Sequence, residues 1–238
     1  MNLYFMESLP KRHGDCIESR RRIPLGLPVT TQNRCRKATI MTRLNLVDPK
    51  TAQGRTKELF DSVQKKLGLV PNLTRGLANS PAALDAYLAF GGALAAASLS
   101  PKTREQIALT VGEVNACGYC LSAHTLLGQK LGLSEDDVHA ARRATSSDPK
   151  TAAILRLAKD IVVKRGELKD ADLRQAREAG ITDGELAEIV AVVSLNIFTN
   201  YFNHIAATAI DFPEVKPGLA AAALVSGDTC STEGSCSN

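Results

Sequence analysis

The sequence has no tryptophan, and aromatic residues make up only 4% of its 238 residues. Sandwiches and barrels depend on aromatic and β-branched side chains, so this scarcity argues against an all-β fold. Alanine, in contrast, occurs 32 times, and alanine is the strongest helix former. The composition therefore favours helices that pack closely through small side chains.

Long apolar segments are also missing. The longest wholly apolar stretch, residues 219–225, is seven residues long, whereas a helix needs about 20 residues to cross a bilayer. We therefore expect no transmembrane segment and no membrane partner. Apolar residues make up 44% and charged residues 23% of the chain, which is typical of a globular protein and argues against general disorder.

The net charge of +4 comes from the N-terminal end of the chain. Residues 1–40 carry a formal charge of +5, which leaves −1 for residues 41–238. Residues 41–238 therefore show no sign of a basic groove, and we expect no nucleic-acid partner. Residues 1–40 contain three prolines and one alanine, and we predict a disordered or non-native leader with Met41 as the natural start. Residues 217–238 are predicted to be a flexible tail.

Helix start and stop signals recur between these ends. A capping side chain precedes a proline at Asp48, Ser80, Ser100 and Asp148. Capping boxes begin at Ser134 and Thr182, and helix-ending glycines are Gly68, Gly132 and Gly180. We predict a single all-α domain over residues 41–216 with about eight helices, near 50–67, 72–79, 81–98, 101–131, 134–144, 149–165, 170–179 and 183–210. The long fourth helix is expected to bend or break near residue 115.

Six cysteines could indicate a secreted disulfide framework. However, the chain is long, no apolar signal core follows a charged start, and two of the cysteines have Cys-x-x-Cys spacing. A reducing compartment, the cytoplasm, is the better expectation. Four of the cysteines lie in the predicted leader and tail and are expected to be unpaired: Cys16, Cys35, Cys230 and Cys236.

The strongest chemical signal is the group Cys117, Cys120 and His124. Spacings of three and four residues bring these side chains to one face of a helix. An adjacent imidazole and a helix N-terminus raise the thiolate fraction of a cysteine, and a second cysteine can resolve a sulfenic acid as a disulfide. Glu113 and Glu105 precede Cys117 on the same predicted helix, and either carboxylate could orient His124 or relay its proton.

Other interpretations of these residues stay open. A structural zinc site would need a fourth ligand, and no second Cys-x-x-Cys or histidine cluster supplies one. A thioredoxin-like site would need surrounding strands, which the sequence pattern does not predict. The cysteines could also be small buried apolar residues without a chemical role. We expect no metal and no cofactor.

The segment resembles the alkylhydroperoxidase D-like proteins of the carboxymuconolactone decarboxylase superfamily. Their pattern is a Glu, eleven residues, and then Cys-x-x-Cys-x-x-x-His, and Glu105, Cys117, Cys120 and His124 fit it without a gap. The resemblance covers residues 41–216. It implies an alkylhydroperoxidase D-like all-α fold, a homo-oligomer that is often a trimer or hexamer, and reduction of hydroperoxides without haem or metal.

The resemblance also implies a role for each residue. Cys120 would be the thiolate that attacks the peroxide, and Cys117 would resolve it through a Cys117–Cys120 disulfide. His124 would be the base, Glu105 would complete the proton relay, and we give Glu113 a supporting role. The reductant would be a dithiol donor of the lipoyl or thioredoxin type. The alternatives are a lactone-type decarboxylase or isomerase, whose members need no Cys-x-x-Cys, and a redox sensor or scaffold without turnover.

A second polar stripe lies on the last predicted helix, which is otherwise apolar. Asn196, Asn200 and His204 are spaced four residues apart in it, so they share one face. They could form a hydrogen-bonded seam in the core or at a subunit contact, or they could form a wall of the cysteine site. Both interpretations stay open.

Overall fold

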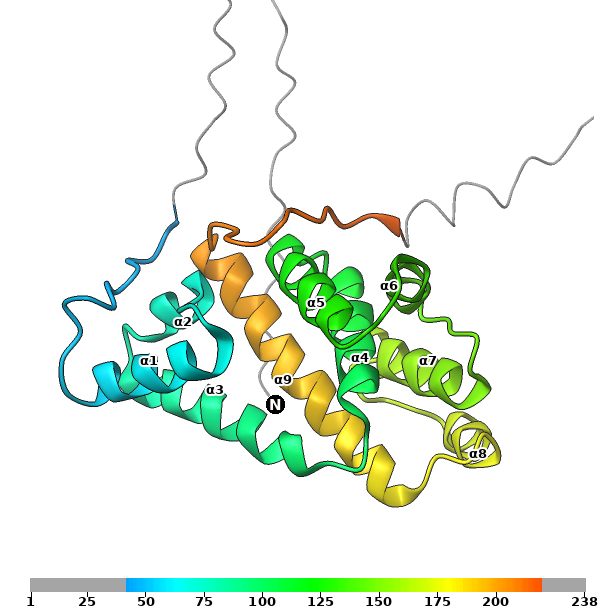
Figure 1. Cartoon of the computed structure of the whole chain (residues 1–238). Coiled ribbons are helices and arrows are strands. Elements are labelled where there is room, and N and C mark those ends of the chain that lie inside the picture. Colours follow the sequence, from blue (N-terminus) through cyan, green and yellow to red (C-terminus); the bar gives the residue numbers. More distant parts are fainter. Residues whose placement is uncertain (1–41, 220–238) are drawn as a thin grey trace, which may run out of the picture. The chain divides into compact units, whose positions relative to one another are not determined.

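All regular structure is helical in the computed structural model, which describes residues 42–219 (Figure 1). The α-helices are α1 Gly54–Leu67, α2 Asn72–Leu77, α3 Pro81–Ala93, α4 Pro101–Val114, α5 Gly118–Lys130, α6 Glu135–Arg142, α7 Pro149–Val163, α8 Asp170–Glu178 and α9 Asp183–Ala206. A short 3-10 helix, Leu94–Ala96, follows α3. The all-α prediction is confirmed. The predicted leader and most of the predicted tail lie outside the described residues.

The helices begin and end largely where local signals predict. Ser80, Ser100 and Asp148 each accept a hydrogen bond from a backbone N–H three residues later, as helix caps do. Both predicted capping boxes are formed. Gly68 and Gly180 have φ angles of +79° and +82°, a left-handed conformation that ends a helix at little cost for glycine.

Two predicted boundaries are wrong by several residues. The Asp48 carboxylate accepts the N–H of Lys50 in a turn, and α1 begins only at Gly54. At the other end, α9 stops at Ala206 because Ala207 adopts a left-handed conformation with φ of +45°. The long helix predicted over 101–131 is two helices, α4 and α5, separated at the expected break near residue 115.

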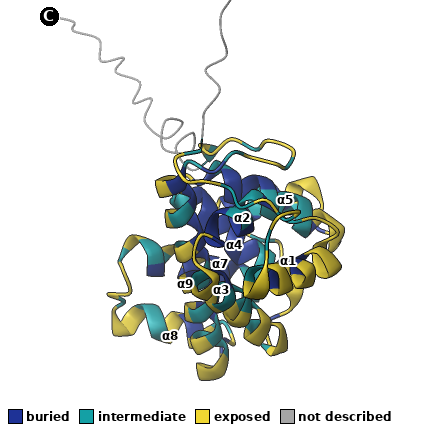
Figure 2. Cartoon of the chain, turned by 90° about the vertical axis from the view of Figure 1, so that its left-hand side faces the viewer, coloured by how far each residue is buried: buried dark blue, intermediate teal, exposed yellow. Residues whose placement is uncertain are grey.

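Two clusters of buried apolar side chains form the core. The larger one gathers side chains from α4 to α9, including Ile107, Leu155 and Val193. The second combines side chains of α1 to α3 with the first turn of α5, and it contains Cys117 and Cys120. Helix α4 contacts α5, α6, α7 and α9, and Figure 2 shows it among the buried central elements. The cysteine pair therefore lies deep in the protein.

Helix α9 is long and apolar enough to cross a membrane by length and composition, the only such helix in residues 42–219, with a mean hydropathy of 1.3. However, 44% of its most apolar window is buried within the protein, and it packs against α4, α5 and α7. We interpret α9 as a core helix.

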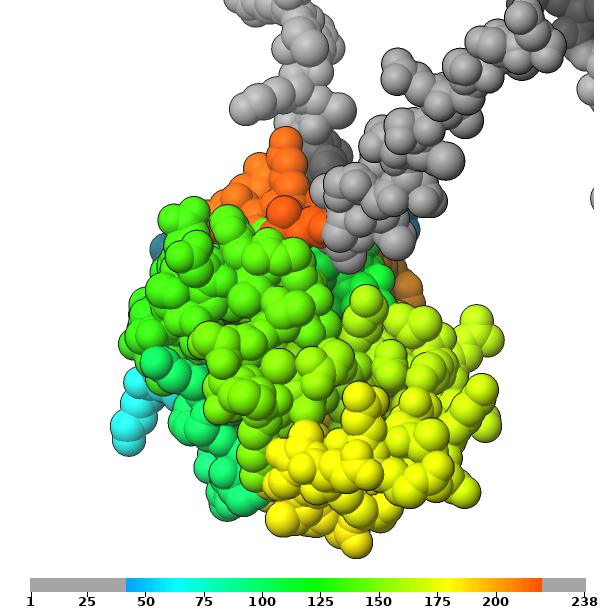
Figure 3. Space-filling model, turned by 90° about the vertical axis from the view of Figure 1, so that its right-hand side faces the viewer, coloured from blue at the N-terminus to red at the C-terminus, as the bar shows by residue number. Residues whose placement is uncertain are grey.

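The C-terminal segment, residues 207–219, leads away from α9 and crosses the N-terminal end of α5 (Figure 1). Ile210, Val215 and Pro217 lie so close to Gly118 that a side chain there would be in van der Waals contact with all three. Figure 3 shows this segment above the face formed by α5 to α8. It therefore covers the end of the helix that carries the cysteines.

Candidate active site

The turn between α4 and α5 positions the two cysteines. Cys117 donates its backbone N–H to the carbonyl of Gly112 at 2.8 Å, and Ala116 adopts φ of +52°. This is the Schellman pattern for ending a helix, with alanine in the place usually taken by glycine. Cys117 then caps α5, because its sulfur accepts the N–H of Cys120 at 3.3 Å. The end of one helix and the start of the next thus fix both residues.

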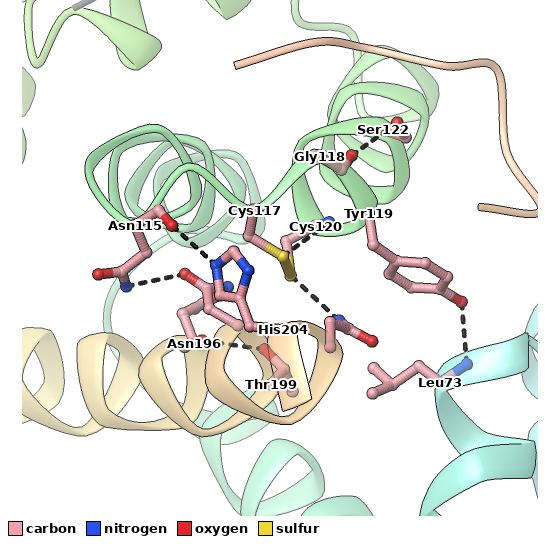
Figure 4. Close-up of a disulfide and its surroundings, with 12 residues drawn as sticks. Leu73, Asn115, Cys117, Gly118, Tyr119, Cys120, Ser122, Asn196, Thr199 and His204 are labelled. Carbon is pink, nitrogen blue, oxygen red and sulfur yellow. Dashed lines mark hydrogen bonds between the residues drawn. A yellow bond between two sulfur atoms is a disulfide. The ribbon is translucent and has the colours of Figure 1, made fainter. Parts of the chain in front are cut away.

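Cys117 and Cys120 are joined as a disulfide, with their Cα atoms 5.3 Å apart (Figure 4). They are only 2% and 3% exposed. Helix α4 approaches closely at this level, because a Cβ placed on Gly112 would lie 3.7 Å from the Cβ of Cys120. The Cα separation is ordinary for a disulfide, so the backbone turn suits reversible formation of this bond.

His124 lies one turn after Cys120 on α5 and pairs with Glu105 of α4. The distance from His124 Nδ1 to Glu105 Oε2 is 2.7 Å, and the two side chains are 23% and 19% exposed. A carboxylate that accepts the Nδ1 proton leaves Nε2 as the atom that takes or gives a proton. The arrangement is therefore that of an oriented acid–base histidine one helical turn from a cysteine pair.

Glu113 lies in a different environment from the one expected. Its Oε2 accepts the Nε–H of Arg142 at 2.8 Å, and its Oε1 accepts the backbone N–H of Gly218 at 2.7 Å. Only 1% of the Glu113 side chain and 6% of the Arg142 side chain is exposed. The supporting role expected for Glu113 was a contact with His124, whereas these hydrogen bonds hold its carboxylate to Arg142 and Gly218. The carboxylate paired with His124 is Glu105.

Two tyrosines border the cysteine cluster. Tyr119 lies between the cysteines in sequence, and its hydroxyl accepts the backbone N–H of Leu73 at 3.0 Å. Half-buried Tyr87 of α3 packs against the same cluster. Burial, together with the negative charge of Glu105, raises the pKa of Tyr87 to about 12. Tyr87 is therefore a neutral hydroxyl within electrostatic reach of the Glu105–His124 pair.

The polar stripe on α9 differs from the predicted one by a single residue. Asn196 and Asn200 are buried as part of it, at 6% and 0% exposure, but His204 is exposed. The third buried residue is Asn203, 5% exposed, which donates its side-chain N–H to the sulfur of Cys120 at 3.3 Å. Positions 196, 200 and 203 stay on one helix face more closely than positions 196, 200 and 204. This spacing could have identified Asn203 from the sequence.

Asn200 and His204 of α9 also form hydrogen bonds with the turn that precedes the cysteines. The side chain of Asn115 donates to Asn200 Oδ1 at 2.9 Å, and His204 Nε2 lies 2.8 Å from the Asn115 carbonyl oxygen. Figure 4 shows Asn115 and His204 beside the disulfide. Both suggested roles of the stripe are thus combined, since it is a hydrogen-bonded seam that also contacts the cysteine site. Within residues 42–219, no group of three or more His, Cys, Asp or Glu side chains could hold a metal ion.

Comparison with known proteins agrees with the motif. The sequence model of the carboxymuconolactone decarboxylase family matches residues 81–160. The structure is similar to that of an uncharacterized peroxidase-related protein from Silicibacter sp. TM1040, with 26% identity, a TM-score of 0.63, and coverage of 75% of this chain and 94% of that chain. An uncharacterized peroxidase-related protein with an alkylhydroperoxidase AhpD core, from Ralstonia eutropha JMP134, has 25% identity, a TM-score of 0.64, and coverage of 71% of this chain and 92% of that chain. Both findings support the predicted superfamily.

The fold also occurs in a protein with a different named activity. The debrominase Bmp8, in complex with 2,3,4-tribromopyrrole, shares 17% identity with a TM-score of 0.63, covering 78% of this chain and 97% of that chain. A search of curated proteins found no match. The comparisons therefore support a peroxidase-related or decarboxylase-like role, and the choice between reactions depends on the site itself.

Proposed function

We propose that this chain, assigned to the carboxymuconolactone decarboxylase superfamily, is a thiol peroxidase that reduces organic hydroperoxides. The observation that carries the proposal is the single helical hairpin α4–α5, which bears both the Cys117–Cys120 disulfide and the Glu105–His124 pair. A cysteine pair that can exchange two electrons and a histidine that can move a proton are the two requirements of peroxide reduction by thiols.

In the first step, the Cys120 thiolate attacks the terminal oxygen of the hydroperoxide. The S–O bond forms, the O–O bond breaks, and Cys120 becomes a sulfenic acid. The alkoxide leaves as an alcohol with a proton supplied by His124, which took that proton from the Cys120 thiol. Glu105 holds the imidazole through Nδ1, at 2.7 Å, and this contact leaves Nε2 as the atom that exchanges the proton.

In the second step, Cys117 attacks the sulfenic acid sulfur, water leaves, and the Cys117–Cys120 disulfide forms. An external dithiol then reduces this disulfide by thiol–disulfide exchange. Overall, one hydroperoxide and one dithiol give one alcohol, one water and one oxidised donor. We propose a lipoyl- or thioredoxin-type donor and a reducing compartment such as the cytoplasm, where such donors are kept reduced.

The position of the cysteines on α5 supports a reactive thiolate. Cys117 caps the helix and Cys120 lies in its first turn. The N-terminal end of a helix carries a partial positive charge, and it favours negative charge on nearby groups. Together with the imidazole one turn away, this environment stabilises the form of the cysteine that attacks peroxides.

The proposal is tested with reduced protein and cumene hydroperoxide. Free thiols are counted after one addition, and peroxide loss is then followed with an excess of a recycling dithiol. Sustained loss of peroxide supports the peroxidase. No change in thiols contradicts it and favours a decarboxylase-like reaction.

A redox sensor without turnover is the second candidate, because both cysteines are almost fully buried, at 2% and 3% exposure. An external dithiol must reach the disulfide for turnover, and burial opposes that approach. A single stoichiometric loss of peroxide that forms the disulfide, with no recycling by lipoyl or thioredoxin donors, would favour the sensor.

We also propose that the chain forms a homo-oligomer through α9. The outward side of this helix exposes apolar side chains: Val190, Phe198, Tyr201 and Ile205 are 45%, 42%, 54% and 66% exposed. No charged residue occurs between Ile189 and Asn203. An uncharged apolar stripe on the helix that contacts the cysteine site is suited to burial against another subunit.

A further inference from the structure

The two polar atoms of the buried Asn203 side chain have different surroundings. Its Nδ2 donates to the sulfur of Cys120 at 3.3 Å. Its Oδ1 is buried and has no hydrogen-bond partner within residues 42–219. Buried amide oxygens are ordinarily paired. An unpaired acceptor on a side chain that touches a reactive sulfur therefore indicates a position for a hydrogen-bond donor from outside the chain.

The orientation of this amide fits the chemistry of Cys120. In the reduced protein the sulfur is a thiolate when it reacts, and a thiolate accepts hydrogen bonds. The reverse orientation would place the amide oxygen against a negatively charged sulfur, which is unfavourable. With Nδ2 on the sulfur, Oδ1 is left to accept a hydrogen bond from a molecule that approaches the same sulfur.

We propose that Asn203 is a catalytic residue that binds both reactants, Cys120 through Nδ2 and the hydroxyl of the hydroperoxide through Oδ1. This inference rests on the proposed function. A hydroperoxide has one O–H, and it lies on the oxygen that the thiolate attacks. When the S–O bond forms and the O–O bond breaks, the same O–H becomes the hydroxyl of the Cys120 sulfenic acid. Oδ1 therefore holds one hydroxyl from substrate to intermediate, while the alkoxide leaves with the proton from His124.

Alkylation by iodoacetamide tests the contact between Asn203 and the sulfur. Iodoacetamide reacts with thiolates, and peptide mass spectrometry assigns the reaction to Cys120 among the six cysteines of the chain. We expect Asn203→Leu to slow alkylation of reduced Cys120 at pH 7 roughly tenfold, the effect of losing one hydrogen bond to a charged group. A variant that merely loosened the packing would expose Cys120 and react faster, so the direction of the change is diagnostic.

Two further variants control for the loss of a buried amide. Asn196→Leu removes a 6% exposed asparagine from the same face of α9, and the side-chain N–H of Asn196 bonds the Val192 carbonyl in its own helix. We expect it to alter alkylation less than twofold. Asn203→Asp is nearly isosteric, so it preserves the packing, and its carboxylate repels the thiolate. It should slow alkylation at least as much as Asn203→Leu.

The rate with cumene hydroperoxide tests the second contact. The carbon of iodoacetamide that the sulfur attacks bears no hydrogen-bond donor, whereas the oxygen of the hydroperoxide that is attacked bears the O–H, so loss of Oδ1 affects mainly the peroxide reaction. We expect Asn203→Leu to slow reduction of cumene hydroperoxide roughly a hundredfold, ten times more than alkylation. Equal losses in the two reactions would overturn the role of Oδ1, and unchanged alkylation would overturn the role of Nδ2. If the unmodified protein does not reduce hydroperoxides, the proposed function and the role of Oδ1 both fail, and alkylation still decides the contact of Nδ2 with sulfur.

Discussion

Glu105 and His124 are 19 residues apart in the chain, yet Oε2 of one lies 2.7 Å from Nδ1 of the other. The break at Asn115 and Ala116 folds α5 back along α4 and makes this contact. The helices approach closely here as well, because a Cβ on Gly128 would lie 3.8 Å from that of Glu105. A carboxylate on the first helix therefore orients an imidazole on the second, one turn beyond Cys120.

This contact predicts the effect of neutralising the carboxylate. We expect Glu105→Gln to slow the reaction of reduced protein with hydroperoxide roughly a hundredfold, the lower range for loss of an acid–base group. The substitution keeps the shape of the side chain, so the melting temperature should change little. Stopped-flow measurement of peroxide loss tests this, and a rate within threefold of the unmodified protein would remove Glu105 from the relay.

Glu113 should behave differently, because it forms a buried ion pair with Arg142. Glu113→Gln leaves the Arg142 charge without its counter-ion, and loss of one partner from a buried pair costs about 3 kcal/mol or more. Urea unfolding should show this loss, while the folded variant should keep most of its rate with peroxide. Adding Arg142→Met should recover part of the stability. A stable variant with a hundredfold lower rate would instead restore the catalytic role expected from the sequence.

The two cysteines should give different products when each is replaced. Cys120→Ser should not react rapidly with hydroperoxide, because no thiol remains next to His124. Cys117→Ser should still react once, but it should stop at a sulfenic acid or a mixed disulfide. Mass spectrometry of the treated proteins distinguishes these species. Normal turnover of Cys117→Ser with unoxidised Cys120 would show that the roles are assigned wrongly.

The raised pKa of Tyr87 predicts that the folded protein loses stability in alkali. This pKa is raised to about 12 by burial and by the charge of Glu105, whereas a tyrosine in the unfolded chain has a pKa of about 10. Above pH 10 the unfolded chain releases this proton and the folded protein retains it, so stability falls as the pH rises from about 10 to 12. Tyr87→Phe should lose less stability over this interval. Urea unfolding at pH 9 and pH 11 measures the difference, and equal losses in both proteins would contradict the assignment.

If the exposed apolar face of α9 is the subunit contact, a charge placed on that face should break the oligomer. Ile205 and Tyr201 are 66% and 54% exposed, so replacing either with Glu should not disturb the core. We expect Ile205→Glu and Tyr201→Glu to dissociate a homo-oligomer into monomers in light scattering after gel filtration. A matched charge at exposed Val163 of α7, which is 60% exposed, should leave the oligomer intact. An unchanged mass for the α9 variants would place the subunit contact elsewhere.

The helices and the cysteine motif could be predicted from the sequence because their determinants are local. A cap at Ser100 bonds a backbone N–H three residues away, and the left-handed glycine at 68 lies next to the helix that it ends. The pattern from Glu105 to His124 is likewise contained in 20 consecutive residues. Even the break near residue 115 has a local cause, the Schellman turn at Ala116.

Tertiary structure decided the partners of Glu113 and Asn203. Glu113 has the better spacing to Cys117 on a continuous helix, but it pairs with Arg142, 29 residues away, once the chain turns. Asn203 reaches the Cys120 sulfur across 83 residues, and no local rule links the two positions. The rotation of α9 about its axis exposes His204 and buries Asn203, and that rotation is set by packing against α4, α5 and α7. Neighbouring residues fix the conformation of the backbone, whereas the contacts of a buried side chain depend on how whole helices pack.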